Sequence, residues 1–247
     1  MTDDILRRQL APTGILRAGI NLSNFLLVTG RGPDGAPQGV APDMAAAVAA
    51  RLEVPVTYVT FDSPGQLADA AADDVWDIGL IGAEPQRAER IAFTTAYAEI
   101  EATFLVPDGS PITAIAQVDR PGIRIAVTGR AAYGLWLERN IRHAELVRTD
   151  SLDSAYETFV AQGLEVLAGL RSRLLKDRDL LPGARILDGH FATVQQAIGT
   201  HRRNAEAAAF LQSLVEELKA GGHVAALIDR YGVGAGLSVA PPVSPAR

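Results

Sequence analysis

Short apolar runs alternate with helix-forming segments along the first hundred residues, and this order constrains the fold most strongly. Residues 15–20, 54–61 and 75–81 have the length and the apolar or β-branched content of strands. Residues 44–52 and 66–72, which lie between them, have the composition of helices. Strands joined by crossover helices run parallel in one sheet. This part of the chain therefore predicts an α/β fold.

The same order recurs further along the chain. Strands are predicted at residues 122–127, 146–147 and 164–168, and helices at 131–140 and 151–162. The similarity lies in the order of the elements and not in sequence identity. We therefore expect two α/β lobes of similar design.

The remaining segments are shorter or lie near the ends of the chain. Residues 2–11 favour a short helix, and residues 189–199 favour an extended segment. Helices are predicted at 172–181, 204–219 and 224–231. Residues 237–247 contain three prolines, which predicts a poorly ordered tail.

Composition excludes several classes of function. The formal charge of −6, from 23 basic and 29 acidic residues, argues against a nucleic-acid partner. The chain has no cysteine, so disulfides and thiolate chemistry are excluded. The four histidines show no metal-ligand spacing, and we expect neither a metal nor another cofactor.

The N-terminus and the hydrophobic runs bear on localisation. The first fourteen residues have acids where a secretory signal needs bases, and no apolar h-region precedes Pro12. As written, the chain is therefore expected not to be exported. No run approaches the roughly 18 apolar residues of a membrane span, so we expect no direct membrane insertion.

A charged turn follows the strand that closes at Gly82. Glu84, Arg87, Glu89 and Arg90 lie between this strand and the apolar segment 91–93. A guanidinium just past the carboxyl end of a strand is well placed to bind a carboxylate in a bidentate manner. The alternative is a solvated turn whose charges pair among themselves.

Several motifs together resemble the family 3 extracellular solute-binding proteins, the amino-acid-type receptors of ABC importers. Residues 14–21 resemble the opening strand of that family, and residues 39–44 resemble its Gly-Phe-x-x-Asp-Leu element. The strand 77–82, then Arg87, then Phe93-Thr-x-x-Tyr97, resembles the family signature. Each motif alone is weak, but their order and spacing extend over nearly the whole chain.

The resemblance implies a two-lobe type II periplasmic-binding fold whose chain crosses the hinge twice. Lobe one would comprise residues 1–101 and 193–247, and lobe two residues 102–192. A small carboxylate-bearing ligand, an amino acid or a related organic acid, would be trapped by hinge closure. The implied partner is an ABC permease. The implied compartment is the periplasm, with the cytoplasm as the alternative because no signal peptide is evident.

The candidate ligand-binding residues follow from the resemblance and from positions after strand ends. In lobe one they are Asn21, Asn24, Phe25, Ser63, Gly82, Ala83, Glu84, Arg87 and, on the return strand, Gln195. In lobe two they are Arg130, Ala131, Tyr133, Leu170 and Arg171.

Two departures from the family pattern concern the ligand. The turn 82–87 lacks the hydroxyl residues that usually precede the arginine. The family's aspartate, which takes the ligand ammonium, corresponds to Leu170. Because an unpartnered buried ammonium costs several kcal/mol, either Glu84 replaces that acid or the ligand lacks an α-ammonium. We therefore expect a carboxylate ligand such as a dicarboxylate or a keto acid.

Two other classes of protein share this fold. Some members act as dehydratases on cyclohexadienyl acids, and Glu84, Glu99 and Glu101 are the acids available for such a role. No catalytic constellation stands out, so we expect a protein that is not an enzyme. Effector domains of LysR-type regulators need a helix-turn-helix, for which residues 1–13 are too short. A separate metabolite-sensing domain stays open.

Overall fold

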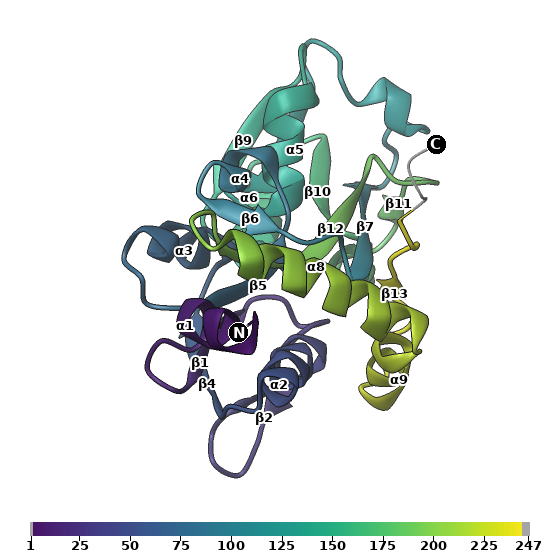
Figure 1. The fold of residues 1–247 in the computed structure, drawn as a ribbon. Helices are drawn as coiled ribbons and strands as arrows, with labels where there is room; N and C mark the ends of the chain where they lie inside the picture. The colour runs from purple at the N-terminus through teal and green to yellow at the C-terminus, as the bar shows by residue number, and fades with distance from the viewer. Residues whose placement is uncertain (1, 244–247) are drawn as a thin grey trace. The chain divides into compact units, whose positions relative to one another are not determined.

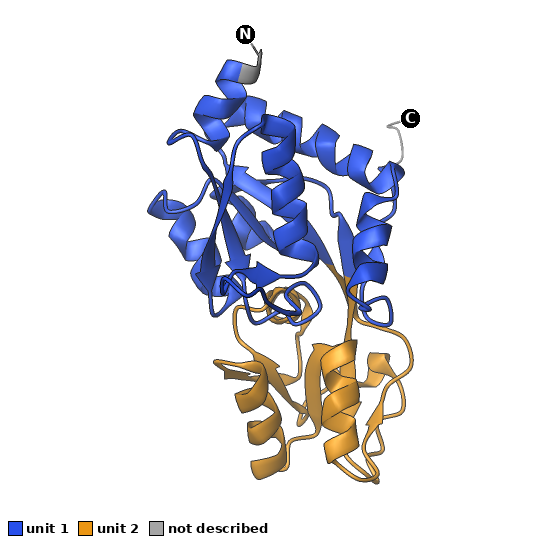
Figure 2. Ribbon diagram, turned by 90° about the horizontal axis from the view of Figure 1, so that it is seen from below, with its two compact units in different colours: residues 1–99, 195–247 blue, residues 100–194 orange. Residues whose placement is uncertain are grey.

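The computed structural model describes residues 2–243 and divides into two compact units. Unit 1 comprises residues 1–99 and 195–247, and unit 2 comprises residues 100–194 (Figure 2). These boundaries lie close to the lobe boundaries predicted from the sequence. That the units are lobes which close on a ligand stays a prediction.

Unit 1 is built on a sheet with the strand order β4-β1-β5-β12 (Figure 1). Its strands are β1 (Leu16–Asn21), β4 (Val56–Phe61), β5 (Ile78–Gly82) and the part of β12 (Ala192–His201) from Gln195 onward. β1 is parallel to both β4 and β5, whereas β12 is antiparallel to β5. The predicted parallel order of the first three strands is therefore present.

Helices and short strands complete unit 1. The helices are α1 (Thr2–Leu10), α2 (Val40–Leu52), α3 (Pro64–Asp69), η1 (Ala70–Ala72), α4 (Pro85–Ala88), α8 (Ala205–Ala220) and α9 (His223–Arg230). The short strands are β2 (Gly30–Arg31), β3 (Pro37–Gln38), β6 (Ile91–Phe93) and β13 (Ser238–Val239).

α2 begins earlier than the predicted residue 44. The preceding residue, Gly39, has φ 148°, and a Cβ there would lie 2.2 Å from the carbonyl oxygen of Leu27. Only glycine fits this close approach of two backbones. Gly39 therefore sets the start of the helix at Val40, and Pro42 falls within its first turn, where proline is tolerated.

A row of glycines crosses the unit 1 sheet. Gly19 of β1 is the register partner of Gly79 of β5, which in turn is the partner of Gly199 of β12. A Cβ on Gly79 would lie 2.9 Å from Leu67 Cδ2, and a Cβ on Gly19 would lie 3.2 Å from Trp76 Cγ. The row thus makes room for Trp76, which is fully buried and donates from Nε1 to the Leu67 carbonyl at 3.1 Å.

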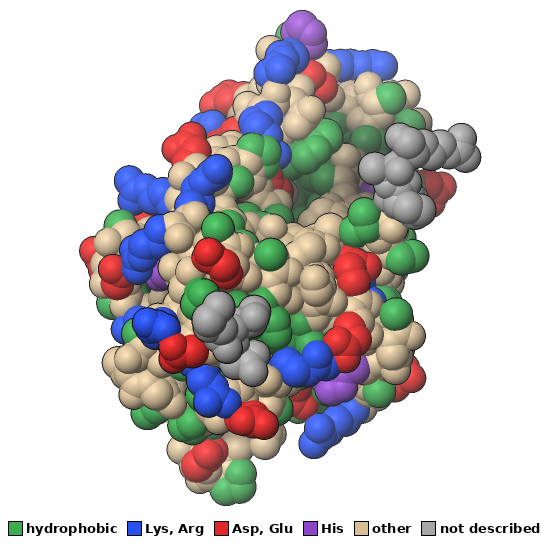
Figure 3. All heavy atoms as spheres, viewed as in Figure 1, with side chains coloured by type: hydrophobic (Ala, Val, Ile, Leu, Met, Phe, Trp, Pro, Cys, Tyr) green, Lys and Arg blue, Asp and Glu red, His purple; other side chains and the backbone are tan. Residues whose placement is uncertain are grey.

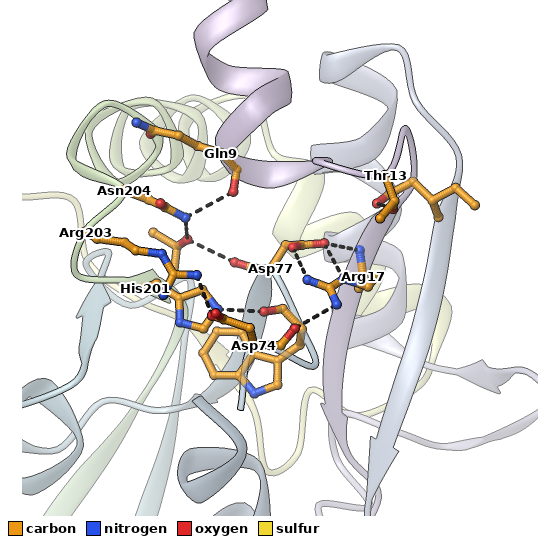
Figure 4. A network of polar contacts seen from close by, with 11 residues as sticks. Gln9, Thr13, Arg17, Asp74, Asp77, His201, Arg203 and Asn204 are labelled. Carbon is orange, nitrogen blue, oxygen red and sulfur yellow. Dashed lines mark hydrogen bonds and ion pairs between the residues drawn. The ribbon is translucent and has the colours of Figure 1, made fainter. Parts of the chain in front are cut away.

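A polar network lies at the amino ends of β1 and β5 (Figure 4). The buried Asp77 carboxylate accepts hydrogen bonds from the backbone and the guanidinium of Arg17 at 2.7 to 3.1 Å. His201 stacks on the Trp76 ring at 4.8 Å and bonds its carbonyl through Nε2 at 2.8 Å. A hydrogen bond from a neighbouring guanidinium, that of Arg203, lowers the pKa of Asp74. The network stabilises the amino ends of these strands, whereas the candidate ligand-binding residues follow their carboxyl ends.

Unit 2 has the strand order β7-β10-β8-β9. Its strands are β7 (Ala98–Val106), which begins in unit 1, β8 (Arg124–Thr128), β9 (Glu145–Thr149), β10 (Val166–Leu170) and the short β11 (Arg185–Ile186). Its helices are η2 (Ile115–Gln117), α5 (Ala132–Asn140), α6 (Leu152–Ala161) and α7 (Arg171–Leu180). β8 is parallel to β9 and β10, and β7 is antiparallel to β10.

Unit 2 has a core of its own. Phe159 of α6 packs with Leu105 of β7, Ala126 of β8 and Leu167 of β10. The hydroxyl of Ser151 accepts a hydrogen bond from the amide of Ser154 at 3.0 Å, which caps α6. The predicted strand and helix order of this part is therefore present.

The predicted disorder of the C-terminal segment is wrong for residues 237–240. Leu237 and Ala240 are buried, and β13 pairs antiparallel with the start of β7. This pairing joins segments far apart in the chain, so local composition did not indicate it. Residues 244–247, which the same prediction covers, lie outside the described residues.

Candidate ligand-binding site

The turn after β5 places the two charged residues of the candidate site. Glu84 precedes the first residue of α4, and Arg87 lies within that helix. Both side chains are buried, with exposed fractions of 8% and 6%. Arg87 Nη1 donates to the Gly82 carbonyl at 2.6 Å. The turn is therefore not solvated at these two side chains.

Ala83, directly after β5, and Gln195, in the neighbouring strand β12, continue the site. The Ala83 amide donates to the carbonyl of Gln195 at 2.7 Å. The Gln195 side chain donates from Nε2 to Glu99 Oε1 at 2.9 Å. β12 is thus fixed to the turn through the backbone of Gln195 and to β7 through the side chain of Gln195.

The other unit 1 candidates follow the carboxyl ends of β1 and β4. Asn21 Oδ1 accepts from the hydroxyl of Ser23 at 2.8 Å, and Asn24 Oδ1 accepts from the amide of Leu26 at 3.2 Å. Ser63 Oγ accepts from the amide of Gln66 at 3.2 Å and caps α3. Phe25 is half-buried. These side chains make turn and cap contacts at the same sheet edge as Gly82, because β1, β4 and β5 are parallel neighbours.

In unit 2, three candidates form the start of α5 beyond the end of β8. Arg130 is exposed and has φ 60°, a left-handed conformation that directs the chain into the helix. Ala131 precedes the first helical residue and is buried. Tyr133 is also buried, and burial raises the pKa of its hydroxyl to about 12, so it is neutral at physiological pH.

The last two candidates lie where β10 passes into α7. Leu170 is 7% exposed and ends the strand. Arg171 Nε donates to Glu101 Oε2 at 2.6 Å, and its Nη2 donates to the Gly189 carbonyl. His190 Nδ1 lies 3.4 Å from the other oxygen of Glu101. The sequence interpretation listed Glu101 only as an available acid and missed it as the partner of Arg171, which lies 70 residues away.

Metal-binding clusters and membrane-spanning helices are both absent from the part of the chain that the structure describes. Among the side chains of residues 4–243, no cluster of three or more His, Cys, Asp or Glu could hold a metal ion. No described helix has both the length and the apolar character that a membrane crossing requires. On the face shown in Figure 3, basic and acidic side chains are interspersed. That face carries no basic stripe of the kind that binds nucleic acid.

A model of the bacterial extracellular solute-binding proteins, family 3, matches residues 23–234. The chain belongs to this family. The match covers both units, so the resemblance predicted from the motifs is confirmed. No curated protein sequence is significantly similar to the chain.

Three solved structures of similar fold are described as amino-acid-binding proteins or solute receptors. A mutant of the arginine-binding protein ArgBP from T. maritima has 18% sequence identity and a TM-score of 0.72, over 94% of this chain and 99% of that one. A solute receptor for L-cysteine of Neisseria gonorrhoeae has 17% identity and a TM-score of 0.72, over 92% of each chain. An ancestral amino acid-binding protein, a precursor of cyclohexadienyl dehydratase, has 18% identity and a TM-score of 0.71, over 93% of this chain and 98% of that one.

These structures establish the fold of this family member as the type II periplasmic-binding fold, as predicted. At these identities they carry no information on the ligand. The roles of the candidate residues in binding therefore stay predictions.

Proposed function

We propose that this family 3 protein traps a small carboxylate-bearing solute by closure of its two units and delivers it to an ABC-type permease. Family membership supports the binding role. Closure on a ligand requires contacts that favour the closed state over the open state. The residues proposed to supply those contacts lie after the carboxyl ends of strands in each unit.

The observation that carries the proposal is the placement of Arg87. Its guanidinium lies just beyond the end of β5 and is oriented by the 2.6 Å bond from Nη1 to the Gly82 carbonyl. Guanidinium donors form a rigid fork, so fixing one nitrogen fixes the directions of the others. A preorganised arginine loses little entropy when it takes a carboxylate.

The start of α5 supplies the proposed second contact. The first backbone amides of a helix have no partner within the helix, and the helix dipole favours an anion at this end. Arg130, two residues before the first residue of α5, adds a positive charge at an exposed position. We assign the ligand carboxylate to Arg87 and to this helix start in the closed protein.

The residues after β10 indicate which ligands are favoured. Leu170 offers no carboxylate there, and the charge of its neighbour Arg171 is balanced by Glu101. A ligand α-ammonium near Leu170 would be left without a counter-charge, which costs several kcal/mol. A keto acid or a dicarboxylate is therefore the favoured ligand class, with Glu84 as the acid that would serve an amino acid instead.

The carboxylate role is tested by isothermal titration of the protein with 2-oxoglutarate, succinate and L-glutamate. Arg87→Ala is expected to weaken binding by about 2–5 kcal/mol, the usual cost of removing one partner of a buried charge pair. That corresponds to a factor of about 30 or more in affinity. Arg90→Ala is the matched control because Arg90 is exposed and lies one turn further along. Equal affinities of the two variants would overturn the assignment of Arg87.

The ammonium question is tested with the matched pair 2-oxoglutarate and L-glutamate, which differ at the α-carbon. We expect the keto acid to bind more tightly and Glu84→Gln to leave its affinity within about threefold, a change below 1 kcal/mol. Tighter binding of glutamate that Glu84→Gln abolishes would assign the acid role to Glu84. Mass spectrometry of the recovered ligand separates binding from turnover, because a dehydratase would change the mass of its substrate.

A further inference from the structure

The strand β4 lies at one end of the strand order in the unit 1 sheet and is hydrogen-bonded on one side only. On that side it pairs with β1 over its whole length, from Val56 opposite Leu16 to Phe61 opposite Asn21. Within residues 2–243, no strand pairs with its other side. The free side of such a strand presents N–H and C=O groups that can pair with a strand of another chain.

The hydrogen bonds to β1 show which backbone groups of β4 point outward. The Leu16 amide donates to the carbonyl of Pro55, directly before β4, at 2.9 Å. Backbone groups alternate in direction along a strand, so the odd-numbered residues of β4 bond β1. The even-numbered residues Val56, Tyr58 and Thr60 therefore direct both their N–H and their C=O away from β1. No described residue bonds any of these outward groups.

The free edge of β4 lacks the features that usually prevent pairing with another chain. Residues 56–61 contain no charged residue and no proline, and their continuous register with β1 leaves no bulge. Thr57 and Thr60 are exposed. The outermost strand of the unit 2 sheet, β9, differs because Glu145 and Arg148 place charges on it. Charges, prolines and bulges are the usual protection of edges, so β4 is the less protected of the two.

We propose that the free edge of β4 pairs with the same edge of a second copy of this chain, antiparallel and about a two-fold axis at Tyr58. Val56 of each copy then lies opposite Thr60 of the other, and Tyr58 lies opposite its own copy. Each opposed pair exchanges two hydrogen bonds. All the outward groups of both strands are thereby satisfied, and the two unit 1 sheets become one continuous sheet.

The charges in and around β4 favour a second copy as the partner. Like charges directly opposite each other destabilise a strand pair, and a strand without charges can meet its own copy without this cost. The nearest acid after the strand, Asp62, falls opposite Val54 of the other copy in the proposed register. The pairing therefore places no acid opposite another acid along the strand.

The backbone bonds at the two ends of β4 select the register. A shift by two residues in one direction would place Thr60 opposite Val54, whose amide already donates to the carbonyl of Ala49 at 3.1 Å. The same shift in the other direction would place Val56 opposite Asp62, whose amide already donates to the side chain of Gln66 at 3.1 Å. Only the axis at Tyr58 pairs every outward group with another outward group.

The size and charge of the chain set the strength of the proposed dimer. Two paired strands of six residues bury less surface than the roughly 1,200 Å² of a stable interface. Each copy carries a formal charge of −6, and the resulting repulsion is screened by salt. The dimer therefore forms and dissociates with protein concentration. It depends neither on a ligand nor on the closure proposed above.

Sedimentation equilibrium of the full chain at about 0.15 M salt, from about 1 to about 300 µM protein, tests the pairing. The mean mass is expected to rise with concentration from 26.1 kDa toward twice that value. Thr60→Pro removes one outward N–H from each copy and keeps the bonds to β1, because proline is tolerated where the N–H of an edge strand faces solvent. The loss of two hydrogen bonds is expected to raise the Kd of the dimer by about tenfold or more.

Arg148→Pro is the matched control on the outermost strand of unit 2. The Glu145 amide donates to the carbonyl of Ile123 at 2.8 Å, so the amide of Arg148 faces away from the sheet in the same way as that of Thr60. This variant is expected to leave the Kd unchanged. Equal weakening by both prolines would overturn the proposal. A mass of one chain at every concentration would also overturn it and would leave the edge to a strand of a different protein.

Single cysteines test the axis in a protein that keeps the native β4 backbone. The chain has no cysteine, and Tyr58→Cys would bring two cysteines to the axis with Cα atoms about 5.5 Å apart, within the range of a disulfide. Thr60→Cys would separate them by about 13 Å. Oxidation is expected to link Tyr58→Cys into a covalent dimer about tenfold faster than Thr60→Cys. Equal rates for the two variants would overturn the proposed pairing.

Discussion

Gly79 shows how strongly a single missing Cβ can determine the packing of unit 1. It lies in the middle of the glycine row, beneath Leu67 and the fully buried Trp76. Gly79→Ala would place a methyl group 2.9 Å from Leu67 Cδ2, and the surrounding core must shift. We expect the free energy of unfolding to fall by about 1–3 kcal/mol, the usual cost of overpacking.

Urea denaturation followed by circular dichroism measures this loss. Gly30→Ala is the control, because a Cβ at Gly30 would meet no atom within 4 Å. Its effect should stay within about 0.5 kcal/mol, as for most surface substitutions. If both variants lose the same stability, the glycine row has no special role in packing.

Individual residues differ in how far their contacts could be predicted from the sequence. Arg87 bonds the carbonyl of Gly82, only five residues earlier. Its surroundings are therefore local, and the turn motif in the sequence was sufficient to predict its position after β5. Arg171 pairs with Glu101, 70 residues away, and no local pattern shows which strand will supply the carboxylate. The sequence therefore placed both arginines after strand ends but left the partner of Arg171 undetermined.

The pairing of β8 with β10 is reinforced by an ion pair at its amino end. Glu165 accepts hydrogen bonds from the backbone amide of Arg124 at 2.8 Å and from its guanidinium at 2.8 Å. The hydrogen bond from the guanidinium is the main reason why the pKa of Glu165 is lowered. A lowered pKa in the folded state contributes stability above the unfolded pKa of about 4.3. That contribution is lost as the pH falls through the folded pKa.

The stability of the protein and of Glu165→Gln should therefore converge as the pH falls below about 4. Above about pH 5 the variant should be less stable by up to about 1 kcal/mol, because the pair is partly exposed. Urea titrations between pH 3 and pH 7 measure both curves. A constant difference across this range would contradict the assigned role of the carboxylate.

Elements defined by local signals were predicted more accurately than those defined by distant pairing. α6 begins after Ser151, whose hydroxyl caps the helix, and such caps can be recognised in the sequence. α3 begins at Pro64 after the Ser63 cap, two residues ahead of the predicted start at residue 66. β13 has only two residues, and its partner β7 lies more than a hundred residues earlier. β7 (Ala98–Val106) is absent from the predicted strands, because Glu99 and Glu101 interrupt its apolar pattern.

At the scale of the whole molecule, the two units differ in chain continuity. Unit 2 is one continuous segment with its own core around Phe159, whereas unit 1 needs both ends of the chain. We expect a fragment of residues 100–194 to fold alone and to melt cooperatively, as followed by circular dichroism. The complementary fragment 1–99 lacks β12 and α8 and is expected to stay largely unfolded. A non-cooperative melt of the 100–194 fragment would show that unit 2 depends on unit 1.

The two tryptophans of the chain fall one in each unit. Trp76 is buried in the unit 1 core against His201, and Trp136 lies beside Phe191 in unit 2. The protein therefore carries two intrinsic fluorophores that report on different events. With Trp136→Phe the emission follows the integrity of the unit 1 core, and with Trp76→Phe it follows the aromatic packing around Phe191 in unit 2, without any attached dye.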